Sequence, residues 1–196
     1  MNCAYTLPFR SIGKDVVIWD RARIVSPEVI TIGDSVIIDD FVLLMGGTEA
    51  RIGSFVHIAA FSSLVGGGLL ILEDFAGLSG GCRVFTGNED YGGGSLTNPA
   101  VPAPYRSPVR STVVLKKHCI VGANSVILPG VTGGEGAVVG ANSLIKEDCQ
   151  PWTVYVGTPA KPVRERPSQK MLELEKELRS SLYDPNGNYL STKERT

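Results

Sequence analysis

Aliphatic residues return at a fixed step along most of this chain, and no other feature of the sequence restricts the fold as strongly. From Ile12 onward the step runs six, six and eight residues, which makes a 20-residue unit; after residue 114 it is six throughout. A helix repeats its apolar residues every three or four positions and a half-buried strand every second one, so neither accounts for the step. A coil with three short strands per turn does account for it, because each strand then points one aliphatic side chain inward.

The sequence therefore predicts an all-β solenoid, in which stacked coils pair their strands in parallel and the aliphatic residues form ladders inside a prism. One position departs from the pattern, since Gly133 stands where an aliphatic residue is expected. The other predicted inward positions are Ile12, Ile18, Ile24, Ile32, Ile38, Leu44, Ile52, Ile58, Leu64, Leu72, Leu78, Val84, Leu115, Val121, Ile127, Val139 and Ile145.

The repeat stops at "FTGNEDYGGGSLTNPAVPAPYRSPVRST", which runs from Phe85 to Thr112, and it resumes at Leu115. We assign residues 85–114 to an excursion loop that leaves the prism. A loop of this length without structure of its own is usually functional in a compact fold. A tolerated surface insertion is the alternative.

The prism itself is predicted to span residues 1–164. The segment "PSQKMLELEKELRSSL" follows, and its apolar residues recur at helical spacing, so we expect a helix within residues 165–183 that caps the last coil. Residues 184–196 are rich in turn formers and polar side chains, and they are expected to form a polar tail. The apolar helical face comprises Met171, Leu174, Leu178 and Leu182.

Composition excludes several classes of partner. The chain has 19 Lys and Arg against 20 Asp and Glu, a net charge of −1, which provides no basic surface for nucleic acid or an anionic membrane. No segment has the apolar length of a signal peptide or a membrane span, so we expect a cytoplasmic protein without membrane insertion. The cysteines lack metal-ligand spacing and are expected to be small buried residues, with no metal required. They are Cys3, Cys82, Cys119 and Cys149.

The hexads, together with "VGANSVILPGV", "VVGANSLI" and "VGTPAKPVR" at Val156 to Arg164, resemble the hexapeptide-repeat acyltransferases over roughly residues 10–180. The resemblance implies a left-handed parallel β-helix, usually a homotrimer, with the active site between neighbouring subunits. Within that family the chain is most similar to the sugar O- and N-acetyltransferases of surface-polysaccharide and lipopolysaccharide biosynthesis. The implied reaction is direct attack by a hydroxyl or amine of a sugar, or of a nucleotide-linked sugar, on the thioester of acetyl-CoA in a ternary complex.

The sequence offers several candidates for the general base. Many sugar acetyltransferases of the family place a histidine after a Thr-Gly pair at the start of the excursion, whereas here Thr86-Gly87 is followed by Asn88. An amide can orient an acceptor through hydrogen bonds, but it cannot take a proton at neutral pH. His57 is one alternative, because strand alternation points it outward from the prism, although a structural role at a subunit interface is equally compatible with that position.

Further candidates lie in the excursion. Glu89 and Asp90 are adjacent carboxylates, and either could act as base or bind an amino-sugar ammonium, or both could be solvated loop charges. Tyr91 and Arg106 are polar residues assigned to substrate binding. A further alternative needs no protein base, because the departing thiolate can accept the proton of a neutral amine. His118, in "LKKHCI", is interpreted as a surface or interface residue.

The resemblance places CoA along the C-terminal coils. The small residues of two "GANS" runs would leave backbone amides open to the pantetheine arm, or they simply turn corners. In "GTPAKPVR", two basic residues can meet the CoA phosphates, while the Thr-Pro pair shapes the exit of the coil. The residues assigned to CoA binding are Gly122, Ala123, Ser125, Gly140, Ala141, Thr158, Pro159, Lys161 and Arg164.

The same residues bear on two other functions. A γ-type carbonic anhydrase shares the prism but needs three histidine ligands for its metal, and this chain has two histidines. A catalytically silent scaffold is the main alternative: the missing histidine favours it, while the retained "GTPAKPVR" and the polar excursion favour an enzyme. Between the two acceptors, a hydroxyl needs a base more than a neutral amine does, so the sequence favours an amino sugar without deciding the matter.

Overall fold

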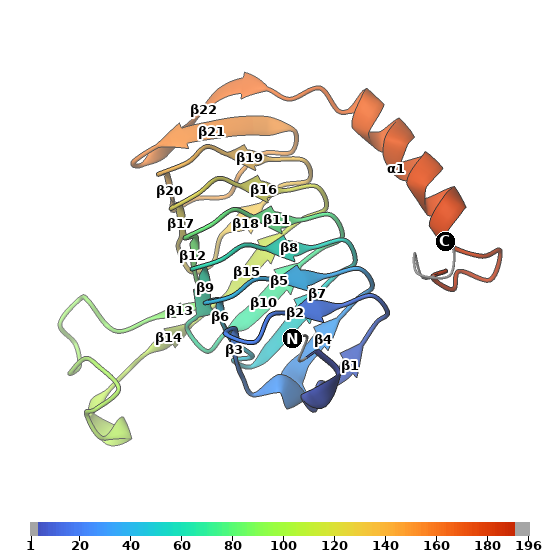
Figure 1. Ribbon diagram of the computed structural model, residues 1–196. Helices are drawn as coiled ribbons and strands as arrows, with labels where there is room; N and C mark the ends of the chain where they lie inside the picture. Colours follow the sequence, from blue (N-terminus) through green and yellow to red (C-terminus); the bar gives the residue numbers. More distant parts are fainter. Residues whose placement is uncertain (1–3, 191–196) are drawn as a thin grey trace.

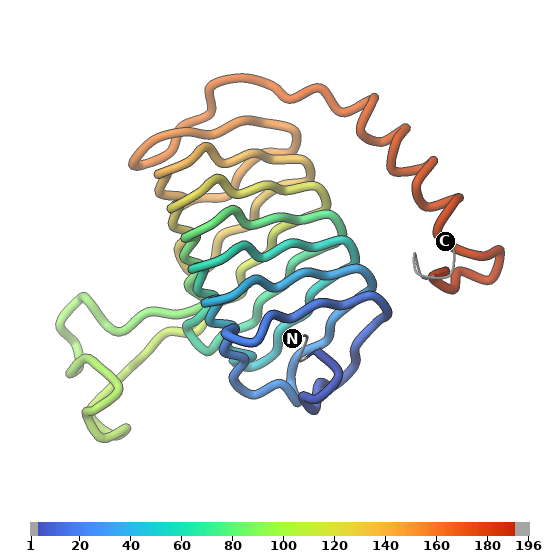
Figure 2. The backbone as a smooth tube through the Cα atoms, in the orientation of Figure 1, coloured from blue at the N-terminus to red at the C-terminus, as the bar shows by residue number. Residues whose placement is uncertain are grey.

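The chain winds into a prism of stacked coils, which rises from the N-terminal to the C-terminal coil as a ladder of short strands in Figure 1 and as a backbone tube in Figure 2. A computed structural model describes residues 4–190. Each coil gives one strand to each of three sheets whose strands pair in parallel within the prism. The predicted solenoid is confirmed.

Strand bounds follow the six-residue step. The first sheet contains β1 (Ser11–Ile12), β4 (Ile30–Ile32), β7 (Glu49–Ile52), β10 (Leu69–Leu72), β15 (Thr112–Leu115) and β18 (Thr132–Gly133). The second contains β2 (Val17–Ile18), β5 (Ile37–Ile38), β8 (His57–Ile58), β11 (Gly77–Leu78), β16 (Ile120–Val121), β19 (Val138–Val139), β21 (Thr153–Gly157) and β22 (Ala160–Glu165). The third contains β3 (Arg23–Val25), β6 (Leu43–Met45), β9 (Ser63–Val65), β12 (Arg83–Phe85), β17 (Val126–Ile127) and β20 (Leu144–Ile145).

Three corners connect these sheets within each coil. We call the turn after the first sheet the first corner, the turn after the second sheet the second corner, and the turn after the third sheet the third corner. Short 3-10 helices occur near the N-terminus and at two turns, at Ala4–Thr6, Pro27–Val29 and Ala103–Tyr105. The last coil ends in an antiparallel hairpin of β21 and β22.

The predicted inward residues form the ladders that the repeat requires. In the first sheet Ile32 lies beside Ile52, Ile52 beside Leu72, and Leu72 beside Leu115. The last of these pairs closes the prism across the excursion without a change of register. These side chains are almost fully buried, and they belong to one continuous core. Burial of that apolar surface is the main stabilising contribution in such a fold.

Gly133 leaves a gap in the ladder that its neighbours fill. A Cβ atom at this glycine would lie 2.8 Å from Sγ of Cys119 and 3.0 Å from Cδ2 of Leu115, so no larger residue fits. Cys82, Cys119 and Cys149 are all buried and unpaired, as expected, and Cys3 lies outside the described residues. Burial raises the pKa of the Cys119 thiol to about 12, so this sulfur serves the core as a small apolar group.

Helix α1 (Gln169–Leu182) differs from its expected place. It does not cover the end of the prism but runs beside the first corner, back towards the N-terminal coils (Figure 1). Most of its apolar face is not the docking face, because Leu174 and Leu178 stay 51% and 37% exposed. At the end of the helix Leu182 is buried, at 6% exposed, and so is the charged Glu175, at 7%. The helix docks through polar residues because the first corner presents cations and a carboxylate to it.

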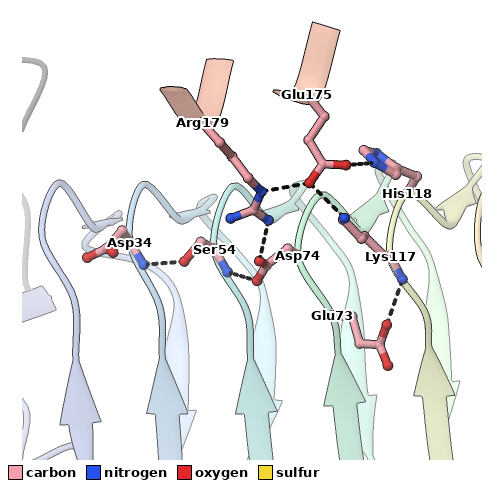
Figure 3. A network of polar contacts seen from close by, with 8 residues as sticks. All are labelled: Asp34, Ser54, Glu73, Asp74, Lys117, His118, Glu175 and Arg179. Carbon is pink, nitrogen blue, oxygen red and sulfur yellow. Dashed lines mark hydrogen bonds and ion pairs between the residues drawn. The ribbon is translucent and has the colours of Figure 1, made fainter. Parts of the chain in front are cut away.

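Figure 3 shows the network that holds the helix. One oxygen of Glu175 lies 2.7 Å from Nζ of Lys117 and 2.6 Å from Nε of Arg179, and the other lies 2.8 Å from Nε2 of His118. Arg179 continues to Asp74 at 2.6 Å. The interpretation of His118 as a surface residue is therefore wrong: it is 5% exposed because the helix covers it.

Aromatic rings extend this contact along the first corner. Phe75 stacks on Phe55 at a centroid distance of 4.8 Å and on His118 at 4.9 Å. All three have positive φ angles near 60°, a conformation that few non-glycine residues adopt and that the stacked corner holds in place. Beyond the helix, Tyr189 is buried against Phe55, so part of the segment expected as a polar tail packs on the prism.

The excursion leaves the prism at the third corner, away from helix α1 (Figure 2). Its own strands β13 (Gly87–Asn88) and β14 (Val109–Arg110) pair antiparallel and form a stem. Residues 1–3 and 191–196 of the predicted prism and tail lie outside the described residues. Within residues 4–190, no helix has the length and apolar character needed to cross a membrane.

Candidate active site

The outer face of the second sheet carries the most accessible histidine. His57 in β8 points away from the core, as predicted, and its side chain is 53% exposed. Its Nε2 lies 3.1 Å from Oδ2 of Asp39, in the preceding coil. A carboxylate oxygen can only accept this hydrogen bond, so Nε2 donates, and Nδ1 has no protein partner among residues 4–190.

Asp39 is not among the residues predicted for the site, although the repeat contains the signal. Ile37 lies beside His57 in the register of the second sheet, and Asp39 stands two residues further on, at the diagonal position of the same outer face. Long side chains at diagonal positions of neighbouring strands can reach each other. The 20-residue unit was therefore sufficient to place this carboxylate near the histidine.

The stem of the excursion is tied to the prism at its base. Oγ1 of Thr86, a buried residue, accepts a hydrogen bond from the amide of Gly68 at 2.9 Å and donates to the carbonyl of Val65 at 3.2 Å. Arg110 donates from Nη1 to the carbonyl of Gly66 at 2.6 Å. These contacts fix the point from which Asn88 and the following carboxylates project. No hydrogen bond in which Asn88 uses its side chain occurs among the described residues.

Glu89 and Asp90, although adjacent, are used differently. Glu89 is ion-paired with Arg106 across the base of the loop, and their side chains are 19% and 14% exposed. Asp90 accepts hydrogen bonds from the amide of Gly92 at 2.8 Å and from Oγ of Ser95 at 3.1 Å. Those bonds lower the pKa of Asp90, so it stays ionised and is a poor proton acceptor at neutral pH.

The ion pair affects the roles predicted for two site residues. Arg106 was expected to bind substrate and Glu89 was a candidate base, but each neutralises the other in this structure. Tyr91, the second predicted substrate residue, is 82% exposed and free to contact a ligand or a neighbouring molecule. Other residues of the excursion, Gly93, Gly94, Ser95, Leu96, Pro104, Tyr105 and Ser107, line a hollow of about 480 Å³.

The glycines assigned to CoA do not offer free amides. The amide of Gly122 donates to the carbonyl of Val139 at 2.7 Å, and that of Gly140 donates to the carbonyl of Tyr155 at 2.7 Å. Ser125 is fully buried, and its Oγ donates to the carbonyl of Gly140 at 2.9 Å. These residues hold successive coils together, which corrects the expectation that their polar groups would meet a ligand.

Other predicted CoA residues remain accessible at the second corner and the terminal hairpin. Ala123 is partly exposed and Ala141 exposed, and Oγ1 of Thr158 donates to the carbonyl of Asn142 at 3.1 Å. Pro159 follows Thr158 at the turn between β21 and β22. Lys161 and Arg164 are exposed on β22, and Lys161 lines a pocket of about 180 Å³ together with Lys146, Glu147 and Asp148.

Among residues 4–190, no group of three or more His, Cys, Asp or Glu side chains is arranged to hold a metal ion. The outer face of the second sheet and the excursion present imidazole, carboxylate, guanidinium and tyrosine side chains.

Comparison with known proteins decides the family. The chain is 41% identical over 179 residues to the dTDP-4-amino-4,6-dideoxy-D-glucose acyltransferase of Escherichia coli, and the match covers 91% of this chain and 93% of that protein. This chain belongs to the hexapeptide-repeat sugar acyltransferases. The predicted enzyme class, an acyltransferase, is confirmed by the same similarity. No family model matches the sequence.

This hexapeptide-repeat acyltransferase is also similar to solved structures of an N-acyltransferase. AntD from Bacillus cereus, in complex with dTDP and 3-hydroxybutyryl-CoA, is 42% identical with a TM-score of 0.85, over 90% of this chain and 93% of AntD. An AntD variant in complex with dTDP-4-amino-4,6-dideoxyglucose and coenzyme A is 41% identical with a TM-score of 0.85, over 90% of this chain and 94% of the variant. A maltose O-acetyltransferase from Clostridium difficile 630 shares the fold alone, at 19% identity and a TM-score of 0.56 over 82% and 71% of the two chains.

Proposed function

We propose that this acyltransferase moves an acetyl group from acetyl-CoA to the amino group of a nucleotide-linked amino sugar, with a dTDP-4-amino-4,6-dideoxyhexose as the first acceptor to test. The observation that carries the proposal is the similarity, over nine tenths of the chain, to proteins named for that acceptor or solved with it. The sequence also favours an amine, because Asn88 replaces the histidine of many sugar acetyltransferases of the family, and a hydroxyl needs a base more than a neutral amine does.

The reaction needs few groups from the protein. The neutral amine attacks the thioester carbon, a C–N bond forms, and the C–S bond to CoA breaks as the tetrahedral intermediate collapses. One proton must leave the amine nitrogen, and it ends on the CoA thiol. We assign its transfer to Nδ1 of His57, because Glu89 is neutralised by Arg106 and Asp90 is held ionised by the excursion.

The active site is proposed to form between subunits of a homotrimer. Exposed apolar side chains surround His57 on the outer face of the second sheet and at the second corner, and Phe41 and Phe61 stack there at a centroid distance of 5.0 Å. Such a patch on a folded surface is typical of a protein interface. The exposed residues are Trp19, Ile37, Phe41 and Phe61.

The excursion supports the same arrangement. It extends away from its own prism (Figure 1). The hydrogen bonds that join it to the coils lie at its stem, at Thr86 and Arg110. Exposed Tyr91, Leu96 and Tyr105 therefore have no apolar cover within one subunit. We propose that the excursion of one subunit walls the acceptor pocket over the second sheet of its neighbour, which would bring Asp90 and His57 of different subunits to one site.

CoA is proposed to lie along the second corner of the C-terminal coils, with its phosphates near Lys161 and Arg164. Neither residue has an ion-pair partner among residues 4–190, so both charges are available to an anion. Acyl-CoA and nucleotide sugars are both cytoplasmic metabolites, which supports the expected cytoplasmic location.

The test is CoA release, measured by chromatography, with acetyl-CoA and dTDP-4-amino-4,6-dideoxyglucose. Turnover is expected with this acceptor and not with its 4-hydroxy counterpart. 3-Hydroxybutyryl-CoA, the thioester present with AntD, is the matched donor: faster turnover with it would overturn the assignment of acetyl. Absence of both CoA binding and turnover would favour the catalytically silent scaffold. Sedimentation equilibrium checks the trimer.

A further inference from the structure

The carboxylate of Asp39, at the outer face of the second sheet, contacts the proposed base directly. Oδ2 of Asp39 lies 3.1 Å from Nε2 of His57, and its side chain is 29% exposed. The neighbouring Asp40 has a different task, since its Oδ1 accepts a hydrogen bond from the amide of Arg21 at 2.9 Å. Of the two adjacent carboxylates, only Asp39 therefore acts on the histidine.

The surroundings of the ring leave Asp39 without a competitor. On one side of β8 in the sheet, Ile37 lies beside His57, and on the other side Gly77 does. Neither residue has a side chain that can form a hydrogen bond. Among residues 4–190, no second protein group bonds to the His57 ring.

We propose that Asp39 is a positioning residue that fixes the tautomer and the orientation of His57, so that Nδ1 is the nitrogen presented to the acceptor amine. The inference rests on the proposed function for its catalytic purpose. An imidazole in solution exchanges between two tautomers, and a carboxylate that accepts from Nε2–H selects the one in which Nδ1 carries the lone pair. When Nδ1 takes the proton from the amine, the ring becomes a cation, and the carboxylate at Nε2 stabilises it until the proton passes to the thiolate.

Nuclear magnetic resonance tests the first half of this proposal without any substrate. The chain contains two histidines, so long-range ¹H–¹⁵N spectra of histidine-labelled protein show two rings, and His57→Gln assigns them. His57 is expected as the Nε2–H tautomer in the parent protein. Asp39→Ala is expected to give a mixture of tautomers, whereas Asp39→Asn keeps an acceptor oxygen and should keep the tautomer. His118 serves as the internal reference, because its partner Glu175 is unchanged.

Kinetics test the second half. Asp39→Ala is expected to lower kcat by about tenfold or more, with the acceptor KM within about twofold of the parent value, because the contact acts in the transition state. The kcat of Asp39→Asn should fall between those of the parent and Asp39→Ala, since asparagine orients the ring but lacks the charge. Asp39→Glu should restore part of kcat. Asp40→Ala is the matched control: it removes an adjacent carboxylate that does not touch His57, and it should change neither kcat nor the tautomer.

The outcomes separate this inference from the proposed function. If His57→Gln retains turnover, the base assignment fails, and the catalytic purpose of Asp39 fails with it. If His57→Gln loses turnover while Asp39→Ala retains both turnover and the Nε2–H tautomer, the base assignment stands and the positioning role is overturned. If Asp40→Ala matches Asp39→Ala in both measurements, the effect belongs to local charge and the specific pairing is wrong.

Discussion

Nε2 of His118 lies 2.8 Å from Oε2 of Glu175, although 57 residues separate the two in the chain, and both side chains are almost fully buried. A carboxylate leaves water at a cost that only good partners offset. Glu175 has three: His118, Lys117 and Arg179. Helix α1 is therefore held along the first corner in part by one buried charge that joins three partners.

We expect Glu175→Gln to lower the free energy of unfolding by about 2 kcal/mol at pH 7, since it weakens several hydrogen bonds to charged groups. In a chain of this size that corresponds to a melting temperature lower by about 5 °C. Thermal unfolding followed by circular dichroism measures the change. Glu177→Gln, an exposed position on the same helix, makes the same charge change without these partners and should be neutral.

The same carboxylate predicts a pH dependence. Burial alone would raise the pKa of Glu175, but hydrogen bonds from Lys117, Arg179 and His118 lower it from 4.5 to about 2. The ionised group therefore stabilises the fold fully above pH 4.5, and that contribution is lost as the pH falls towards 2. The difference in stability between the parent and Glu175→Gln should shrink over this range. A difference that stays constant from pH 6 to pH 3 would contradict the assignment.

Gly136 is expected to tolerate no side chain. Its φ is +65°, and a Cβ atom would lie 2.3 Å from Cε3 of Trp152. Gly136→Ala should destabilise by about 1–3 kcal/mol through overpacking and backbone strain, and Trp152 fluorescence should report the displaced ring. Gly130→Ala separates the two causes, because Gly130 also has a positive φ but has open space around the Cβ position. Equal losses at both glycines would show that the Trp152 contact contributes nothing.

Removal of the excursion between Gly92 and Ser107 should abolish acyl transfer and leave the prism folded. The deleted residues make no core contact, while the stem is held separately by Thr86 and Arg110. We expect a melting temperature within a few degrees of the parent value and no CoA release. Retained turnover would show that the excursion is not a wall of the acceptor pocket.

Charge reversal on the terminal hairpin tests the CoA assignment. Lys161→Glu together with Arg164→Glu should raise the KM for acetyl-CoA about tenfold or more, because charge-assisted hydrogen bonds to phosphate are lost. The effect should be smaller for 3′-dephospho-acetyl-CoA and at high salt. Lys170→Glu reverses one charge on helix α1, where the lysine side chain is 78% exposed, and should leave this KM unchanged. A similar rise in KM for that variant would indicate a general effect of net charge.

The solenoid could be predicted almost completely from the sequence, because each coil repeats one physical requirement. Ile18, Ile38 and Ile58 meet in one ladder as their spacing requires. The position of helix α1 could not be predicted in this way, because an apolar pattern identifies a helix but not the polar residues against which it docks. Glu175 turns inward because of cations on a corner distant in sequence, and no local pattern carries that information.

The candidate site divides in the same way. The outward direction of His57 follows from strand alternation, and its carboxylate partner follows from the repeat once the register is known. The pairing of Glu89 with Arg106 does not follow, because it depends on how an irregular loop folds back on itself. For Ser125 the motif predicted a ligand contact, but its hydroxyl donates a hydrogen bond to the carbonyl of Gly140 in the next coil.

The excursion is inserted where Leu72 and Leu115 still pair as if they belonged to an uninterrupted repeat. The part of the chain that keeps the protein folded and the part proposed to recognise the acceptor are consequently under separate constraints. Substitutions, shortening or replacement of the excursion can alter the choice of sugar at little thermodynamic cost to the coils. A prism of this kind can therefore serve as a constant frame on which acceptor specificity diverges one loop at a time.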